Sequence, residues 1–132
     1  MVYVGASWDA RDQARQIAQH VMSKGAVITS SWLFWEAPRD MSRRELNACI
    51  RSMDVGGVIA ADTLILFTDA PSTKGGFYTE FGIALGWNEY CMTRDPERFK
   101  NIITVGENPC PNGFFSGIQN YKTIDLFREH WA

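Results

Sequence analysis

The chain has 132 residues, of which 45% are hydrophobic and 21% charged, and its formal net charge is −2. This length and balance predict one compact domain. The negative net charge disfavours binding to the phosphate backbone of nucleic acid. No apolar run approaches the roughly 20 residues of a membrane span.

The chain starts almost at once with Val2-Tyr3-Val4, a buried-strand pattern, and shows no signal peptide. We therefore expect a cytoplasmic protein. The three cysteines are scattered and the two histidines lie far apart, which disfavours a zinc site and favours free thiols. We expect no bound metal and no cofactor.

The first elements in chain order are a strand, a helix and a second strand. Apolar residues predict a buried strand at 2–5. Apolar side chains at helical spacing predict a helix over 10–24, which Gly25 ends. A short second strand is predicted at 26–29.

An aromatic-rich loop is predicted next, over 30–41. Ser42 and Glu45 then form a capping box that begins a helix to about Ala61. The apolar run 63–68 predicts a third strand that is covered on both faces. A glycine-pair loop, a helix over 78–92, a strand at 101–105, a fifth strand at 121–124 and a helix over 126–131 complete the chain.

Strands that alternate with helices predict βαβ units and a parallel sheet. We expect a single α/β domain of three layers, with five strands between two layers of helices. In such a domain the ligand crevice lies at the carboxyl ends of the strands, where the loops 5–9, 30–41 and 69–79 converge.

Glu80 follows the glycine pair Gly75-Gly76 and the third strand, at the expected beginning of a helix. Glycines let a ligand approach the backbone, and free N–H groups with the helix dipole favour an ionised carboxylate. A positioned carboxylate beside a crevice is what covalent chemistry at a sugar carbon requires. The alternative is a first-turn glutamate that only complements the dipole.

Asp54 interrupts an apolar stripe on its helix, because it shares an i+4 row with Leu46, Ile50 and Val58. A buried carboxylate needs a partner, a position near the crevice, or a proton. The alternative places Asp54 at the edge of the stripe, bonded to a neighbouring loop.

Tyr3 lies in the first strand, where a buried hydroxyl needs a hydrogen-bond partner. If that partner is Glu80, the phenol orients the carboxylate and holds its charge; a backbone carbonyl is the alternative. In the crevice loops, Trp8 offers a flat surface on which a nucleobase can stack. For Phe34 and Trp35, in the same loops, the sequence does not decide between a place in the site and a place in the core.

Three segments then stand in a recognisable order: Tyr3-Val4-Gly5-Ala6-Ser7-Trp8, the acid Asp54 before the third strand, and a Gly-Gly-x-x-x-Glu-x-Gly-x-Ala-Leu run from Gly75. Together they resemble the nucleoside 2-deoxyribosyltransferase family, which includes hydrolases of 2′-deoxynucleoside 5′-monophosphates. The resemblance covers residues 2 to about 125. It implies a flavodoxin-like or Rossmann-like sheet, cleavage of an N-glycosidic bond, a small-molecule nucleoside or nucleotide substrate, and a homo-oligomer.

By position, the resemblance implies that Glu80 is the nucleophile, that Tyr3 orients it, and that Asp54 is the acid that contacts the substrate. With the crevice loops, it suggests a set of substrate-binding residues: Gly5, Ser7, Trp8, Asp69, Ser72, Lys74, Gly75 and Gly76.

The chain departs from the family's transferases, which carry another acid shortly before the nucleophile. Here that stretch is Ser72-Thr73-Lys74. The family's hydrolases place a serine there to hold phosphate. Transfer and hydrolysis, and nucleoside and 5′-monophosphate substrates, therefore stay open.

Two other classes of function are also open. A non-catalytic nucleotide-binding module would hold the same ligand uncleaved, and a flavodoxin-like electron carrier would hold a yellow chromophore. We favour the enzyme because a pure binder has no need of an ionised carboxylate under the sugar. Arg43 and Arg44, at a helix start, are expected on a solvated face.

Overall fold

A computed structural model describes residues 1–69, 76–107 and 117–131. Within these ranges four parallel strands form one sheet in the order β1-β2-β3-β4. They are β1 (Val2–Gly5), β2 (Thr63–Phe67), β3 (Asn101–Val105) and β4 (Gln119–Tyr121). The α-helices are α1 (Arg11–Ser23), α2 (Arg43–Ala60), α3 (Gly76–Cys91) and α4 (Ile124–His130), and three short 3-10 helices lie at Trp8–Ala10, Ser31–Leu33 and Pro96–Arg98. The predicted class, α/β with a parallel sheet, is confirmed.

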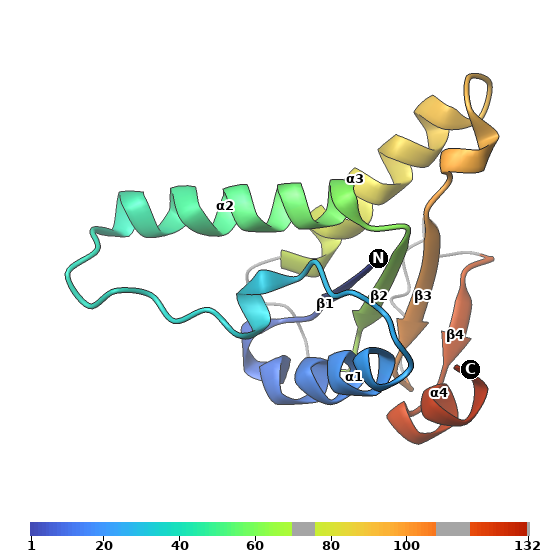
Figure 1. Ribbon diagram of the computed structural model, residues 1–132, viewed down its shortest axis with the longest axis horizontal. Coiled ribbons are helices and arrows are strands. Elements are labelled where there is room, and N and C mark those ends of the chain that lie inside the picture. The colour runs from blue at the N-terminus through green and yellow to red at the C-terminus, as the bar shows by residue number, and fades with distance from the viewer. Residues whose placement is uncertain (70–75, 108–116, 132) are drawn as a thin grey trace.

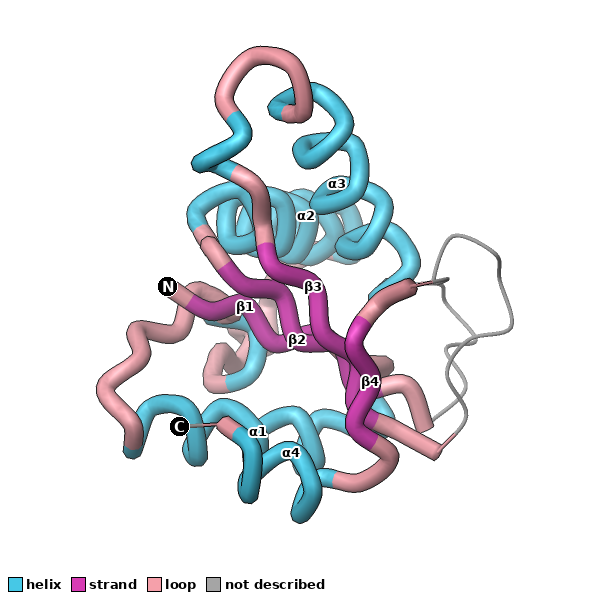
Figure 2. The backbone as a smooth tube through the Cα atoms, turned by 90° about the vertical axis from the view of Figure 1, so that its right-hand side faces the viewer, coloured by secondary structure: helices cyan, strands magenta, loops and turns pink. Residues whose placement is uncertain are grey.

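Helices flank the sheet. Figure 2 shows α2 and α3 on one side of the strands and α1 and α4 on the other, and Figure 1 gives the same arrangement. β2 lies between two neighbours, and four of its five residues are buried. This burial explains the continuous apolar run that predicted it. The strand residues Val4, Ile65 and Val105 belong to one core with Ile17 of α1 and Phe81 of α3.

The predicted second strand is reduced to an isolated bridge, so the described residues hold four strands where five were predicted. Val2 N–H donates to Val27 O and Thr29 N–H donates to Val2 O, each at 2.8 Å, which pairs Ile28 with Val2. The pairing stops there because a 3-10 helix begins at Ser31. Ile28 still lies on the outer side of β1, where a flavodoxin-like strand order puts its second strand.

Several boundaries differ from the prediction. Gly25, with φ +90°, follows α1 as expected. The last strand is Gln119–Tyr121 rather than 121–124, because Thr123 accepts a hydrogen bond from Leu126 N–H and so begins α4 early. α3 begins at Gly76, two residues before its predicted start, which places Glu80 in the second turn.

Within the described ranges, no helix is both long enough and apolar enough to cross a bilayer. Cys49 and Cys91 are free thiols, as predicted, and Cys110 lies outside the described residues.

Candidate active site

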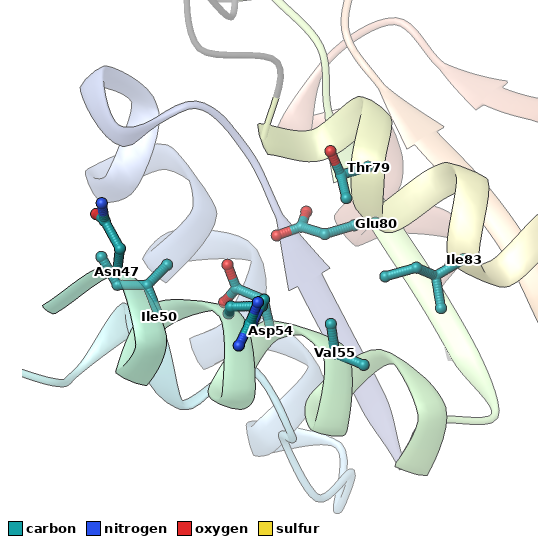
Figure 3. Close-up of a pocket in the computed structure, with 8 residues that line it drawn as sticks. Asn47, Ile50, Asp54, Val55, Thr79, Glu80 and Ile83 are labelled. Atoms are coloured by element: carbon teal, nitrogen blue, oxygen red, sulfur yellow. The ribbon is translucent and has the colours of Figure 1, made fainter. Parts of the chain in front are cut away.

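Three side chains from three elements meet at one phenol oxygen. The hydroxyl of Tyr3 in β1 donates to Glu80 Oε1 of α3 at 2.6 Å, and Asp54 Oδ1 of α2 lies 3.2 Å from the same hydroxyl oxygen. Tyr3 is fully buried, Glu80 is 5% exposed and Asp54 is half-buried. Figure 3 shows the carboxyl groups of Asp54 and Glu80 turned toward each other. The structure therefore brings together the three residues predicted to be catalytic.

Two glycines make room for this cluster. A Cβ on Gly57 would lie 2.9 Å from two ring carbons of Tyr3 and 2.6 Å from the carbonyl oxygen of Thr29, so only glycine lets α2 approach β1 this closely. A Cβ on Gly5 would overlap Glu80 Oε2. Gly5 was predicted to bind substrate. The space beside it holds the carboxylate of Glu80.

Burial sets the protonation of the cluster. It raises the pKa of Glu80 to about 8, while the hydrogen bond from Tyr3 lowers that pKa and the charge of Asp54 raises it. Burial also raises the pKa of Asp54, against the hydrogen bond from Tyr3. The pKa of Tyr3 is raised, first by burial and then by both carboxylates, so the phenol keeps its proton. The two carboxyl groups therefore share one proton at neutral pH and titrate as a pair.

The geometry favours Asp54 as the holder of the shared proton. A phenol has one proton to donate, and 2.6 Å is typical of a short O–H···O⁻ bond to a charged carboxylate. A proton on Asp54 would make its 3.2 Å contact a second hydrogen bond, with the phenol oxygen accepting. Among the described residues Glu80 Oε2 has no hydrogen-bond partner, so a proton there would find no described acceptor. The cluster thus favours a charged Glu80 beside a protonated Asp54.

Glu80 does not lie in the first turn of its helix. The prediction that the helix dipole favours its charge is therefore wrong, and so is the alternative of a first-turn glutamate. Glu80 is the fifth residue of α3, and the first turn of that helix contains no acidic residue. The dipole acts mainly within the first turn. The group that favours a charge on Glu80 is the hydroxyl of Tyr3, not the free N–H groups of the helix.

A pocket of about 220 Å³, here called the acid pocket, opens beside the two carboxyl groups (Figure 3). Its described lining comes from α2 and α3: Asn47, Ile50, Arg51, Asp54, Val55, Thr79, Glu80 and Ile83. The volume is below the range of about 300–1,000 Å³ that holds a whole drug-sized ligand. The acid pocket is therefore too small for a whole ligand of that size and can hold one part of it.

Ser7 and Trp8 lie just after β1 but are not among the described lining of the acid pocket. Ser7 is 7% exposed, and its hydroxyl has no partner in the described part of the chain. Trp8 is 60% exposed, and the guanidinium of Arg11 lies 4.4 Å from the centre of its ring. Arg11 also donates to the carbonyl oxygens of Trp32, Leu33 and Trp35, which fixes the 32–35 segment beside Trp8.

Of the other two crevice aromatics, Phe34 is exposed and Trp35 is partly buried.

The remaining substrate-binding predictions fall on the loop after β2. Asp69 accepts a hydrogen bond from the N–H of Glu107 at 2.6 Å, and it is not in the described lining of the acid pocket. Gly76 is the first residue of α3. The predicted residues Ser72, Lys74 and Gly75 lie outside the described residues, as does Thr73.

Arg51, Asn47 and Ile83 line the acid pocket but were not predicted from the sequence. Helical spacing was the available signal: Arg51 and Asn47 precede Asp54 by three and seven positions, and Ile83 follows Glu80 by three. Residues at such spacing share a helix face. Nothing in the sequence shows that these two faces lie opposite each other.

Comparisons with protein-family models, curated proteins and solved structures give no match. The resemblance to the nucleoside 2-deoxyribosyltransferase family therefore stays a prediction from the motifs. In the described part of the chain, no group of three or more His, Cys, Asp or Glu side chains is placed to hold a metal ion.

Proposed function

We propose that this protein cleaves the N-glycosidic bond of a 2′-deoxynucleoside or its 5′-monophosphate through a covalent glycosyl intermediate on Glu80. The observation that carries the proposal is the 2.6 Å hydrogen bond from buried Tyr3 to buried Glu80, with Asp54 at the same hydroxyl. On this proposal the chain is a cytoplasmic, homo-oligomeric member of the nucleoside 2-deoxyribosyltransferase family. Its domain is then three-layered and flavodoxin-like, with the segment around Ile28 as a vestige of a fifth strand.

The first step forms a bond from a Glu80 oxygen to C1′ of the sugar and breaks the bond from C1′ to the base nitrogen. The electron pair of the broken bond leaves with the base, and Asp54 supplies the proton that neutralises it. Tyr3 stabilises the charge on Glu80 before attack and fixes the direction of the carboxylate.

The second step regenerates Glu80. Another base or a water molecule attacks C1′ from the face that the first base left, and the ester bond to Glu80 breaks. The carboxylate of Asp54 takes the proton that the incoming nucleophile gives up, so the sugar keeps its original configuration.

The test is base release from a panel of 2′-deoxynucleosides and their 5′-monophosphates, measured by chromatography. We expect Glu80→Gln to lower kcat/KM by at least about a thousandfold, as removal of a nucleophile does. Glu89→Gln is the matched control, since Glu89 is an exposed acid on the same helix. Base release by Glu80→Gln near the wild-type rate would contradict the mechanism.

The same assay separates the remaining options. With a second free base present, a new nucleoside indicates transfer, whereas free deoxyribose or its 5-phosphate indicates hydrolysis. Tight binding of nucleotides that stay intact would instead favour the non-catalytic binding module.

A further inference from the structure

We propose that Arg51 of α2 recognises a phosphate group on the substrate, at the mouth of the acid pocket. This inference rests on the proposed function, because it assumes that a sugar occupies the pocket beside Asp54 and Glu80. It assigns a specificity-determining role to a residue that none of the sequence motifs contains.

Arg51 lines the acid pocket and also a second hollow of about 620 Å³, here called the outer hollow. The described lining of the outer hollow is Arg44, Asn47, Ala48 and Arg51. Asn47 and Arg51 belong to both, so the outer hollow continues the acid pocket toward the N-terminal end of α2. Figure 1 shows this end of the helix projecting beyond the sheet.

Neither Arg44 nor Arg51 forms an ion pair with any described residue. Arg15, Arg98 and Arg128 each pair with an aspartate three positions earlier: Asp12, Asp95 and Asp125. The nearest acid on α2 to Arg51 is Asp54, whose Oδ1 faces the hydroxyl of Tyr3 instead. The guanidinium group of Arg51 is therefore available to an anion.

Two carboxyl groups in the acid pocket and a net charge of −2 oppose the approach of a negatively charged substrate. A guanidinium group at the mouth offsets that repulsion, and its planar fork matches two phosphate oxygens. With Asp54 and Glu80 in the acid pocket and Arg51 at its mouth, a nucleotide would bind with its sugar in the pocket and its phosphate outside it.

Arg44 extends the positive charge away from the pocket. It precedes Arg51 by seven residues on α2, which puts it on the same face and roughly 10 Å farther along the axis. Arg51 lines both hollows, whereas Arg44 is in the described lining of the outer hollow alone. We therefore assign recognition to Arg51, and long-range attraction of the anion to Arg44.

The experiment measures kcat/KM for one 2′-deoxynucleoside and for its 5′-monophosphate with the wild type, Arg51→Gln and Arg43→Gln. For Arg51→Gln we expect the ratio of monophosphate to nucleoside to fall about ten- to a hundredfold, the effect of one charged hydrogen bond. Arg43→Gln should keep the wild-type ratio, because Arg43 is in the described lining of neither hollow. An unchanged ratio for Arg51→Gln, or a wild type that does not favour the monophosphate, overturns the inference and leaves the proposed function standing.

A binding measurement keeps the two proposals separable. If the wild type cleaves no member of the panel of 2′-deoxynucleosides and 5′-monophosphates, the proposed function fails, and calorimetric titration with the same monophosphate still tests Arg51. At least about tenfold weaker binding to Arg51→Gln than to Arg43→Gln supports the inference. Equal affinities, or no measurable binding to the wild type, overturn it.

Discussion

Tyr3 holds two carboxyl groups together with a single hydroxyl. Without it, Glu80 and Asp54 would face each other in a buried site with no described group between their charges. The hydroxyl donates the short bond to Glu80, so the proton that the pair shares is left to Asp54. This division gives each acid the protonation state that its proposed role requires.

Tyr3→Phe tests whether the hydroxyl of Tyr3 keeps Glu80 charged and Asp54 protonated. Removal of the hydroxyl leaves Glu80 Oε1 without its donor, and the loss of a hydrogen bond to a charged group predicts a fall of kcat by about ten- to a hundredfold. The free energy of unfolding should fall by about 1–3 kcal/mol, because a buried acceptor is left unsatisfied.

Tyr121→Phe is the control, since its hydroxyl accepts a hydrogen bond from Gln119 on β4. Full activity of Tyr3→Phe with normal stability would contradict the role given to the phenol. Activity is measured as base release and stability by denaturant unfolding.

At the scale of elements, the features that the sequence predicts correctly are those that a local pattern of residues determines. The apolar run of β2 lies where expected. Of the stripe that Asp54 interrupts, Val58 is buried, whereas Leu46 and Ile50 are only partly buried. The segment 26–29 could not be predicted as a single bridge, because its pairing depends on where the next turn begins. The alignment of α2 with α3 could not be predicted either, because it depends on contacts between residues far apart in sequence.

Gly57 shows how one of those contacts positions the candidate site. Gly57→Ala would push a methyl group against the ring of Tyr3 and the carbonyl of Thr29. We expect it to lower the free energy of unfolding by about 1–3 kcal/mol and to reduce activity by displacing the phenol.

Gly56→Ala is a matched control one residue earlier, where an added Cβ meets nothing within 4 Å. Its higher helix propensity should raise the free energy of unfolding by about 0.5–1 kcal/mol. Both variants are measured by chemical unfolding and base release. Equal effects at the two positions would contradict the close packing of α2 on Tyr3.

At the scale of the whole molecule, the candidate site affects stability. Folding buries Glu80 and raises its pKa from the ordinary 4.5 to about 8, and burial moves the pKa of Asp54 in the same direction. Between pH 4.5 and about pH 8 the folded state therefore binds more protons than the unfolded state. The stability of the folded state is therefore greatest below the unfolded pKa and falls as the pH rises toward 8.

Unfolding measured between pH 5 and pH 8 should show this loss in the wild type, at up to about 1.4 kcal/mol per pH unit. Glu80→Gln carries no titrating group at this position, so its stability should depend less on pH over the same range. Parallel curves for the two proteins would show that the pair of Asp54 and Glu80 binds no extra proton in the folded state, and the shared proton would then be wrong.

The most direct test of the central claim is to detect the covalent intermediate. The protein is mixed with a 2′-deoxynucleoside or its 5′-monophosphate, quenched in acid within the first turnover, digested and analysed by mass spectrometry. The account predicts a deoxyribosyl or phosphodeoxyribosyl adduct on the peptide that contains Glu80, absent from Glu80→Gln. Base release by the wild type with an adduct on another residue, or with inversion of the sugar and no adduct, would contradict it.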